Sequence, residues 1–334
     1  MSVIRTVLGD IDAATLGVCY AHEHIVIDQS FVTQQYPDFL LEDIEKITEE
    51  LCAFHRAGGR AMVDSMPCGG GRNVTKLAMI SSKSNVHILC PTGLHQKKYY
   101  PDGHWSERAS AEQMARIFID EIEFGIDGND TNGPELLRTH HNAGLIKVAS
   151  ELDAIGPREQ KIFEAAAIAH SRTGVPILTH TEQGTAAMLQ IDLLLQLGVN
   201  PHSIVISHLD RKPDSSYHRE VLSRGVFLEY DSAFRWKTKE NPTRDLLIDL
   251  ANSGFLEQLM LGMDAARNRY WTTFGGSPGL SFLLDTFSQE LRDLGFTDQH
   301  LATIFVDNPS RAYALASAPE QPLAAITHNA KHVL

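Results

Sequence analysis

The sequence predicts a closed barrel of eight parallel β-strands, each followed by a helix, which is the (β/α)8 or TIM-barrel class of α/β protein. Short apolar runs typical of strands alternate with longer amphipathic stretches along nearly the whole chain. Eight such runs occur, and this number favours a closed barrel over an open sheet. The length of 334 residues is common for one barrel with elaborated loops.

The predicted strands are short and rich in aliphatic and β-branched residues. In order, they cover residues 17–27, 61–65, 86–93, 145–150, 176–181, 204–209, 226–231 and 259–264. Segments between them, such as 41–51 and 160–170, have apolar residues at helical spacing. No Gly-, Ser- or Pro-rich linker interrupts this alternation, so we expect a single domain over residues 1–317. The pattern is lost at residues 318–334, where we expect a C-terminal tail.

Charge and composition restrict the partners. The net charge is −13 and no cluster of Lys and Arg stands out, which argues against nucleic acid or an anionic membrane and favours a small-molecule substrate. No run approaches the roughly 18 apolar residues of a membrane span, so we expect a cytoplasmic protein. The cysteines are widely spaced and form no C-x-x-C pair, which predicts free thiols, most of them buried.

Lys147 stands in the middle of the fourth predicted strand, within the apolar run of residues 144–150. A bare ammonium group buried there would be costly unless it were paired or chemically changed. A salt bridge to Asp64 or Asp264 is one explanation. The other is that the neutral amine captures carbon dioxide and becomes a carbamate, the modified residue N6-carboxylysine.

Histidines and an aspartate occupy other predicted strands. His22 and His24 are two residues apart in the first strand, so their side chains point the same way. His180, His208 and Asp264 fall at or near the ends of the fifth, sixth and eighth strands, at the rim where barrel enzymes build active sites. One such histidine is more often a core residue than a ligand, but this convergence predicts a metal site. Imidazoles and carboxylates without thiolates suit Zn²⁺ or a similar divalent ion.

Two ions side by side would need a bridging anion from the protein. The carbamate of the modified lysine would offer one oxygen to each ion. We therefore predict that His22, His24 and Asp264 hold the first ion and that His180 and His208 hold the second. A hydroxide bridging the two ions would be the nucleophile, and Asp264 would take its proton.

Six motifs follow one another at barrel spacing and resemble the phosphotriesterase-like family of the amidohydrolase superfamily. They are Ala-His-Glu-His at 21–24, Gly-Leu-Ile-Lys-Val-Ala at 144–149, Thr-His-Thr at 179–181, Ser-His-Leu-Asp-Arg at 207–211, Gly-Met-Asp at 262–264 and Asp-Asn-Pro at 307–309. The resemblance extends from about residue 6 to about residue 316. It implies a (β/α)8 barrel with a binuclear zinc-type centre and a carboxylated lysine, and a homodimer.

Members of that family differ in substrate, and the fold cannot choose among them. Segments 210–214 and 264–270 are most similar to the branch with sugar-lactone hydrolases and broad esterases. We therefore expect hydrolysis of carboxylate esters or lactones, including phosphorylated sugar lactones, with organophosphate and phosphonate esters as side substrates. The alternatives are amide hydrolysis of an N-acyl amino compound, a dedicated phosphotriesterase, and a catalytically silent binding barrel.

Candidate substrate-binding residues follow the third, seventh and eighth strands. They are Tyr99, Lys237, Arg267 and Tyr270. Cationic groups at this rim would favour an acidic or phosphorylated substrate. Solvated charges and structural salt bridges are common at any barrel rim, and they remain the alternative for these residues.

Overall fold

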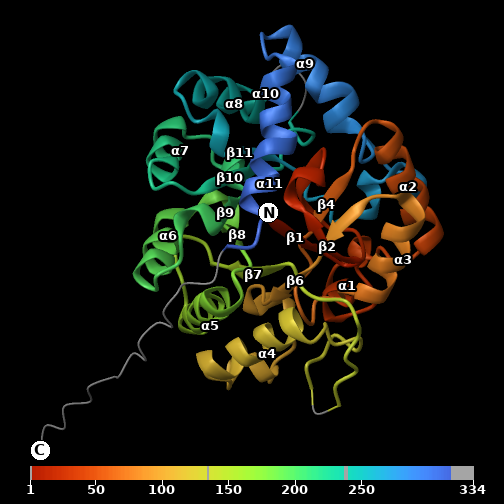
Figure 1. Ribbon diagram of the computed structural model, residues 1–334, viewed down its shortest axis with the longest axis vertical. Coiled ribbons are helices and arrows are strands. Elements are labelled where there is room, and N and C mark those ends of the chain that lie inside the picture. Colours follow the sequence, from red (N-terminus) through yellow and green to blue (C-terminus); the bar gives the residue numbers. More distant parts are fainter. Residues whose placement is uncertain (1, 134, 237–239, 317–334) are drawn as a thin grey trace, which may run out of the picture.

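Eight strands at the predicted positions form the parallel barrel at the centre of the computed structural model, which describes residues 2–133, 135–236 and 240–316 (Figure 1). The barrel class is thereby confirmed. The strands are β3 Cys19–Glu23, β4 Ala61–Asp64, β5 His87–Leu89 with β6 Pro91–Gly93, β7 Leu145–Ala149, β8 Ile177–His180, β9 Ile204–Ser207, β10 Phe227–Tyr230 and β11 Leu259–Leu261.

The prediction of one continuous third strand at residues 86–93 is wrong in one detail, because the segment is divided into two strands at Cys90. β5 pairs with β4, whereas β6 pairs with β7. Pro91 has no N–H with which to continue the first pairing. The carbonyl of Cys90 instead accepts a hydrogen bond from the N–H of Gly144 at 2.9 Å. The chain thus passes from one partner strand to the other within a single barrel position.

The remaining barrel strands pair in sequence order from β6 to β11, and all of these pairs are parallel. The ring closes between the last strand and the first. There the backbone N–H groups of Met263 and Asp264 donate to the carbonyl of His22, at 3.2 and 3.0 Å. Closure of the barrel therefore brings Asp264, which follows β11, beside His22 of β3.

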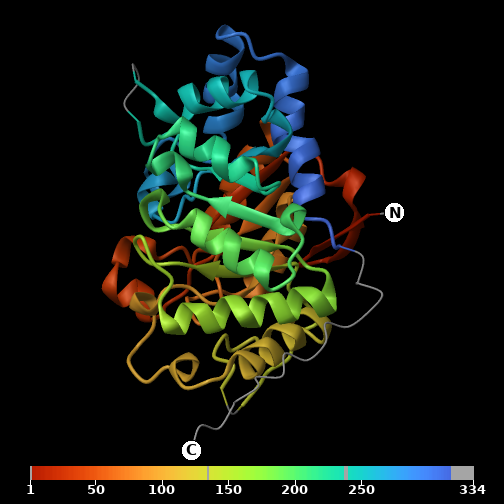
Figure 2. The ribbon, with the colours of Figure 1, turned by 90° about the vertical axis from the view of Figure 1, so that its left-hand side faces the viewer.

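Helices surround these strands (Figure 1), and Figure 2 shows two of them, α4 and α5, side by side. The longer ones are α2 Ile44–Arg56, α3 Val74–Ser84, α4 Ala111–Glu123, α5 Pro157–Thr173, α6 Ala187–Gln196, α7 Ser215–Leu222 and α8 Pro242–Asn252. Short helices are α1 Phe31–Gln35, α9 Ser288–Asp293, α10 Asp298–Ala302 and α11 Asn308–Ala312, with π-helical turns at Leu283–Phe287 and Thr303–Asp307. Both helical segments expected from periodicity are present, in α2 and α5.

An antiparallel hairpin of β1 Val3–Thr6 and β2 Gly9–Asp12, which the sequence pattern did not predict, closes the amino-terminal end of the barrel. Ile4 of the hairpin and Tyr313 belong to one apolar cluster with inward-facing strand residues such as Leu145 and Val205. This packed floor leaves the opposite rim as the open end of the barrel.

Two further expectations concern the membrane and the thiols. Among the described residues, no helix combines the length and the apolar character that crossing a bilayer requires. All four cysteines are free; Cys52 is half-buried and the other three are buried. The predicted tail at 318–334 lies outside the described residues, and the single-domain limit at residue 317 stays a prediction.

Candidate metal centre

A β-bulge in β3 directs both of its histidines towards the barrel interior. Cys19 and Ala21 pack in the apolar floor, so regular alternation would next point Glu23 inward and His22 outward. The register with β4 slips between Tyr20 and Glu23, which inserts one extra residue. Bulges of this kind re-aim side chains beside active sites. Here the bulge places His22 on the inner side directly after Ala21.

The first predicted ligand group assembles around His22. Ligand atoms of His22, His24 and Asp264 all lie within 4.8 Å of one another. Nε2 of His24 is 3.1 Å from Oδ1 of Asp264, and Nε2 of His22 is 3.7 Å from the same oxygen. Nδ1 of His24 is buried and has no hydrogen-bond partner among the described residues. These atoms form a compact set of nitrogen and oxygen donors that could hold a divalent ion.

Lys147 completes this group from β7. Its side chain is buried, and its Nζ lies 3.3 Å from Nε2 of His22. Within the described ranges, neither Asp64 nor Asp264 comes within ion-pair distance of this nitrogen, so the salt bridge considered from sequence is not formed. Burial lowers the pKa of Lys147 to about 8, against the opposing charges of Asp264 and Glu229. A lysine with such a pKa carries an appreciable fraction of neutral amine, the form that reacts with carbon dioxide.

The second predicted pair lies beside the first. The ring centroids of His180 and His208 are 4.5 Å apart, and those of His22 and His208 are 4.7 Å apart. His208 and Asp264 also share left-handed backbone conformations, with φ of 71° and 46°. Such strain in residues other than glycine is concentrated at functional sites. The structure therefore gathers all six predicted ligands, while their roles as ligands stay a prediction.

The protonation states of these histidines suit metal binding. Burial holds the pKa of His22 well below its usual value, and it lowers the pKa of His180 to about 3 and that of His208 to about 4. Burial alone would raise the pKa of Asp264, but its hydrogen bond to His24 and nearby arginines keep that pKa well below the usual range. Neutral imidazoles and an ionised carboxylate are the forms that bind divalent metals.

Two arginines hold the outer oxygen of Asp264. Nη2 of Arg211 donates to Oδ2 of Asp264 at 2.6 Å and to Oδ1 of Asp231 at 2.8 Å. Arg235 reaches the same two oxygens, at 3.2 Å on Asp264 and 2.9 Å on Asp231. The sequence alone did not predict that these two arginines hold Asp264.

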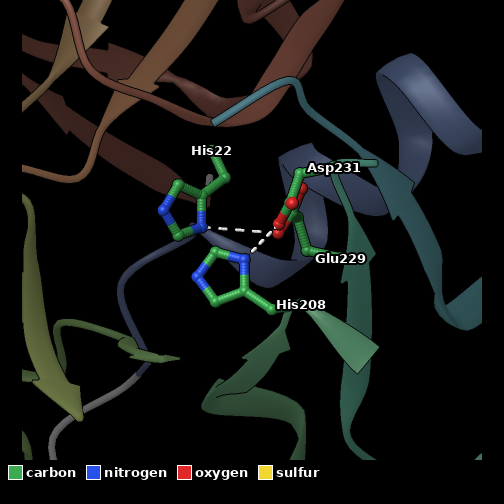
Figure 3. Close-up of side chains that lie close together, drawn as sticks. All are labelled: His22, His208, Glu229 and Asp231. Atoms are coloured by element: carbon green, nitrogen blue, oxygen red, sulfur yellow. Dashed lines mark hydrogen bonds and ion pairs between the residues drawn. The ribbon is translucent and has the colours of Figure 1, made fainter. Parts of the chain in front are cut away.

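Two acidic residues behind the histidines were missed altogether. Figure 3 shows His22 facing Glu229 and His208 facing Asp231. Nδ1 of His22 is 3.3 Å from Oε2 of Glu229, and Nδ1 of His208 is hydrogen-bonded to Oδ2 of Asp231. A signal was present in the sequence: like Lys147, Glu229 is a charged residue inside an apolar strand run.

A cavity of about 380 Å³ opens above this centre. Three of the candidate substrate-binding residues, Tyr99, Arg267 and Tyr270, line it, and their role in binding substrate stays a prediction; Lys237 lies outside the described residues. Arg267 is not free, because its Nη1 donates to Oδ2 of Asp38 at 2.6 Å and its guanidinium lies 4.4 Å from the ring centroid of Phe39. The other lining residues come mainly from the loops that follow the strands: His22, His24, Val32, Phe39, Met66, Pro67, Gly70, His95, Tyr100, His180, His208, Arg211, Arg235, Asp264 and Ala266.

A (β/α)8 barrel with imidazoles and carboxylates converging on a rim cavity is the arrangement of an enzyme active site. The model of the phosphotriesterase family matches residues 2–313, so the chain belongs to that family and is a hydrolase. A relative from Mycoplasmopsis synoviae named phospho-furanose lactonase is 32% identical over 321 residues, covering 93% of this chain and 91% of that one.

Solved structures agree with this assignment. An amidohydrolase from Mycoplasma synoviae superposes with a TM-score of 0.91 at 30% identity, covering 96% of this chain and 95% of that one. A lactonase from Listeria monocytogenes has a TM-score of 0.86 at 28% identity, with 94% of this chain and 100% of that one covered.

Proposed function

We propose that the protein hydrolyses lactones and related carboxylate esters at a centre of two divalent metal ions, most simply Zn²⁺. The observation that carries this proposal is Lys147, a buried lysine that has no carboxylate partner in the described part of the chain and lies 3.3 Å from a histidine of a compact donor set. Such a lysine is explained if it is carboxylated and bridges two ions. The names of relatives as lactonases support the choice of substrate.

For the six gathered side chains we propose the same division between two ions that the sequence suggested. His22, His24 and Asp264 would hold one ion, and His180 and His208 the other, with carboxylated Lys147 between them. When bound, the metal pair would lower the pKa of a water and polarise the ester carbonyl.

The contacts of Asp264 limit the path by which it can transfer a proton. Its Oδ1 faces the histidines of β3, where the attacking water would lose a proton. Its Oδ2 is held by Arg211 and Arg235, which remain protonated and cannot accept that proton. We therefore expect Asp264 to return the proton from its inner side to the leaving alkoxide, without a relay through neighbouring side chains.

The rim supports an acidic substrate. Arg267 and Tyr270 line the cavity, and Asp38 already occupies the guanidinium of Arg267 with a carboxylate. A phosphate or carboxylate of the substrate would make the same charge-assisted contact after displacing Asp38. Phosphorylated sugar lactones carry the phosphate that this contact with Arg267 needs. Neutral esters and organophosphates would be hydrolysed without making the contact.

A matched substrate panel tests the proposal. Zinc-loaded protein would be assayed with phosphorylated sugar lactones, plain lactones, neutral aryl esters, phosphotriesters and N-acyl amino acids, with metal content measured on the same sample. Lactones should be hydrolysed best, and phosphorylated ones should have the lowest KM. Turnover of only phosphotriesters, or of only N-acyl amino acids, would replace the proposed substrate class, and no turnover in the presence of bound metal would reject it.

A further inference from the structure

Glu229 is a buried carboxylate that the proposed reaction does not use. It lies in the middle of β10, is 0% exposed and points into the barrel beneath the metal-ligand cluster. Neither of its oxygens has a hydrogen-bond partner in the described part of the chain. Because buried polar groups are nearly always satisfied, an unpartnered carboxylate in a barrel core requires an explanation.

The group that Glu229 faces is the back of His22. Oε2 of Glu229 is 3.3 Å from Nδ1 of His22, and Oγ of Ser207 is 3.0 Å from the same nitrogen. The opposite nitrogen, Nε2, is the one that faces Lys147 and Asp264. The imidazole of His22 therefore stands between Glu229, which Figure 3 shows on one side of the ring, and the proposed metal position at Nε2 on the other.

Space for this arrangement is created at Gly262, directly after β11. A Cβ on Gly262 would lie 2.8 Å from Oε1 of Glu229 and 2.6 Å from the carbonyl oxygen of His22. Any side chain at this position would push against both groups at once. Gly262 thus lets Glu229 approach the backbone and ring of His22.

A third cation is the competing explanation, since donor atoms of His22, His208, Glu229 and Asp231 all lie within 4.8 Å of one another. The contacts argue against it. Nδ1 of His208 is hydrogen-bonded to Asp231, and Asp231 also accepts from two arginines. Nδ1 of His22 is hydrogen-bonded to Ser207, so within the described residues Glu229 is the one group of the four without a hydrogen bond, which is too few free ligands for a closed zinc site.

We propose that Glu229 is a positioning residue that shares the Nδ1–H of His22 with Ser207 once an ion is bound, and so directs Nε2 of His22 towards the metal. This inference rests on the proposed function, because it needs an ion at Nε2. Metal-binding histidines commonly donate their second N–H to a carboxylate, which fixes the tautomer and the ring orientation. Glu229 would add a negative charge close to the dication, and the dication in turn accounts for an otherwise unpaired carboxylate.

Metal affinity, measured by zinc titration against a chelator, tests the role without relying on activity. Glu229→Met, which removes the acceptor, should weaken binding of at least one ion by about 10- to 100-fold. Glu229→Asp, which withdraws the carboxylate by one methylene, should lose nearly as much. Glu229→Gln keeps an acceptor oxygen and should lose less. Glu121→Gln is the matched control, because Glu121 is equally buried but pairs with Arg72 outside the cavity; it should leave metal affinity unchanged.

Each outcome of the zinc titration either supports or overturns the positioning role of Glu229. Folded Glu229→Met and Glu229→Asp proteins that bind zinc within about twofold of the unmodified chain would overturn the positioning role while leaving the metal centre intact. If the Met variant does not fold, the Asp and Gln variants give the answer. Three ions in the unmodified chain, with one lost in the Glu229 variants, would make Glu229 a ligand instead. An unmodified chain that binds no metal would reject the proposed function and this role together.

Discussion

Lys147 is the side chain on which the two halves of the proposed centre depend. It lies against His22 of β3, while its own strand pairs with β8, the strand that ends at His180. A carbamate here would be the only negatively charged bridge that the six gathered side chains supply. Substitution of this one residue should therefore disrupt the whole proposed centre.

Replacing Lys147 by alanine should remove bound metal and lactone hydrolysis together, each by at least about 100-fold, because a bridging ligand matters more than a residue behind a ligand. A short carboxylic acid should restore part of both. The measurements are metal content and initial rate on one preparation. Lys83→Ala, at an exposed lysine of α3, is the control and should change neither. A Lys147→Ala protein with full activity would exclude the bridged centre.

The pair of Arg267 and Asp38 should set the preference for acidic substrates. Arg267→Ala should raise KM for a phosphorylated lactone by about 10-fold or more, which is the loss of one charge-assisted contact. Asp38→Asn should lower that KM, because it removes the carboxylate that competes for the guanidinium. KM for a neutral aryl ester should stay within about twofold in both variants. Equal effects on charged and neutral substrates would make the pair a structural salt bridge.

At the scale of elements, the close approach of β6 to β7 positions Lys147. Gly93 has a φ of 101°, and a Cβ there would lie 2.1 Å from the carbonyl oxygen of Lys147. Gly93→Ala should therefore reduce the free energy of unfolding by roughly 2–4 kcal/mol and also lower metal occupancy. Gly103 also has a positive φ, but no atom lies within 4 Å of its added Cβ. Gly103→Ala should cost only about 1 kcal/mol, and urea unfolding compares the two; equal losses would contradict the packing argument.

The sequence predicts elements where periodicity alone determines them. Short apolar runs locate every barrel position, because the strands of a parallel barrel are buried on both faces and read as nearly continuous apolar segments. It does not reveal the bulge that re-aims His22, since that depends on the register with β4. The break at Cys90 follows from Pro91 and from two different neighbours, and the hairpin at Val3–Asp12 has too little apolar alternation to stand out.

The residues of the site also divide into those that can be predicted from sequence and those that depend on tertiary contacts. Residues whose chemistry is unusual for their position, such as Lys147 or paired His22 and His24, can be found from sequence. The contacts of Arg211 and Arg235 with Asp264 cannot, because loops of unknown conformation carry these arginines. The ion pair between Arg267 and Asp38 also depends on loop conformation and cannot be predicted from sequence.

At the scale of the whole molecule, the proposed metals join strands that are far apart in the chain, from β3 to the end of β11. Ligands that bind only the folded state stabilise it by mass action. Removing metal with a chelator should therefore lower the free energy of unfolding by about 2.7 kcal/mol for each ion present at 100 times its Kd. Urea unfolding with chelator and then with added zinc measures this, and Lys147→Ala should show little response. Identical curves with and without metal would mean that the ions do not connect these strands.

The most direct test of the central claim is a zinc titration of metal-free protein in bicarbonate buffer, with bound metal and lactone hydrolysis followed together. We predict that activity rises with added zinc and stops rising at two ions per chain. Lactone hydrolysis that is undiminished in the metal-free protein, or that is complete with a single ion, would contradict it.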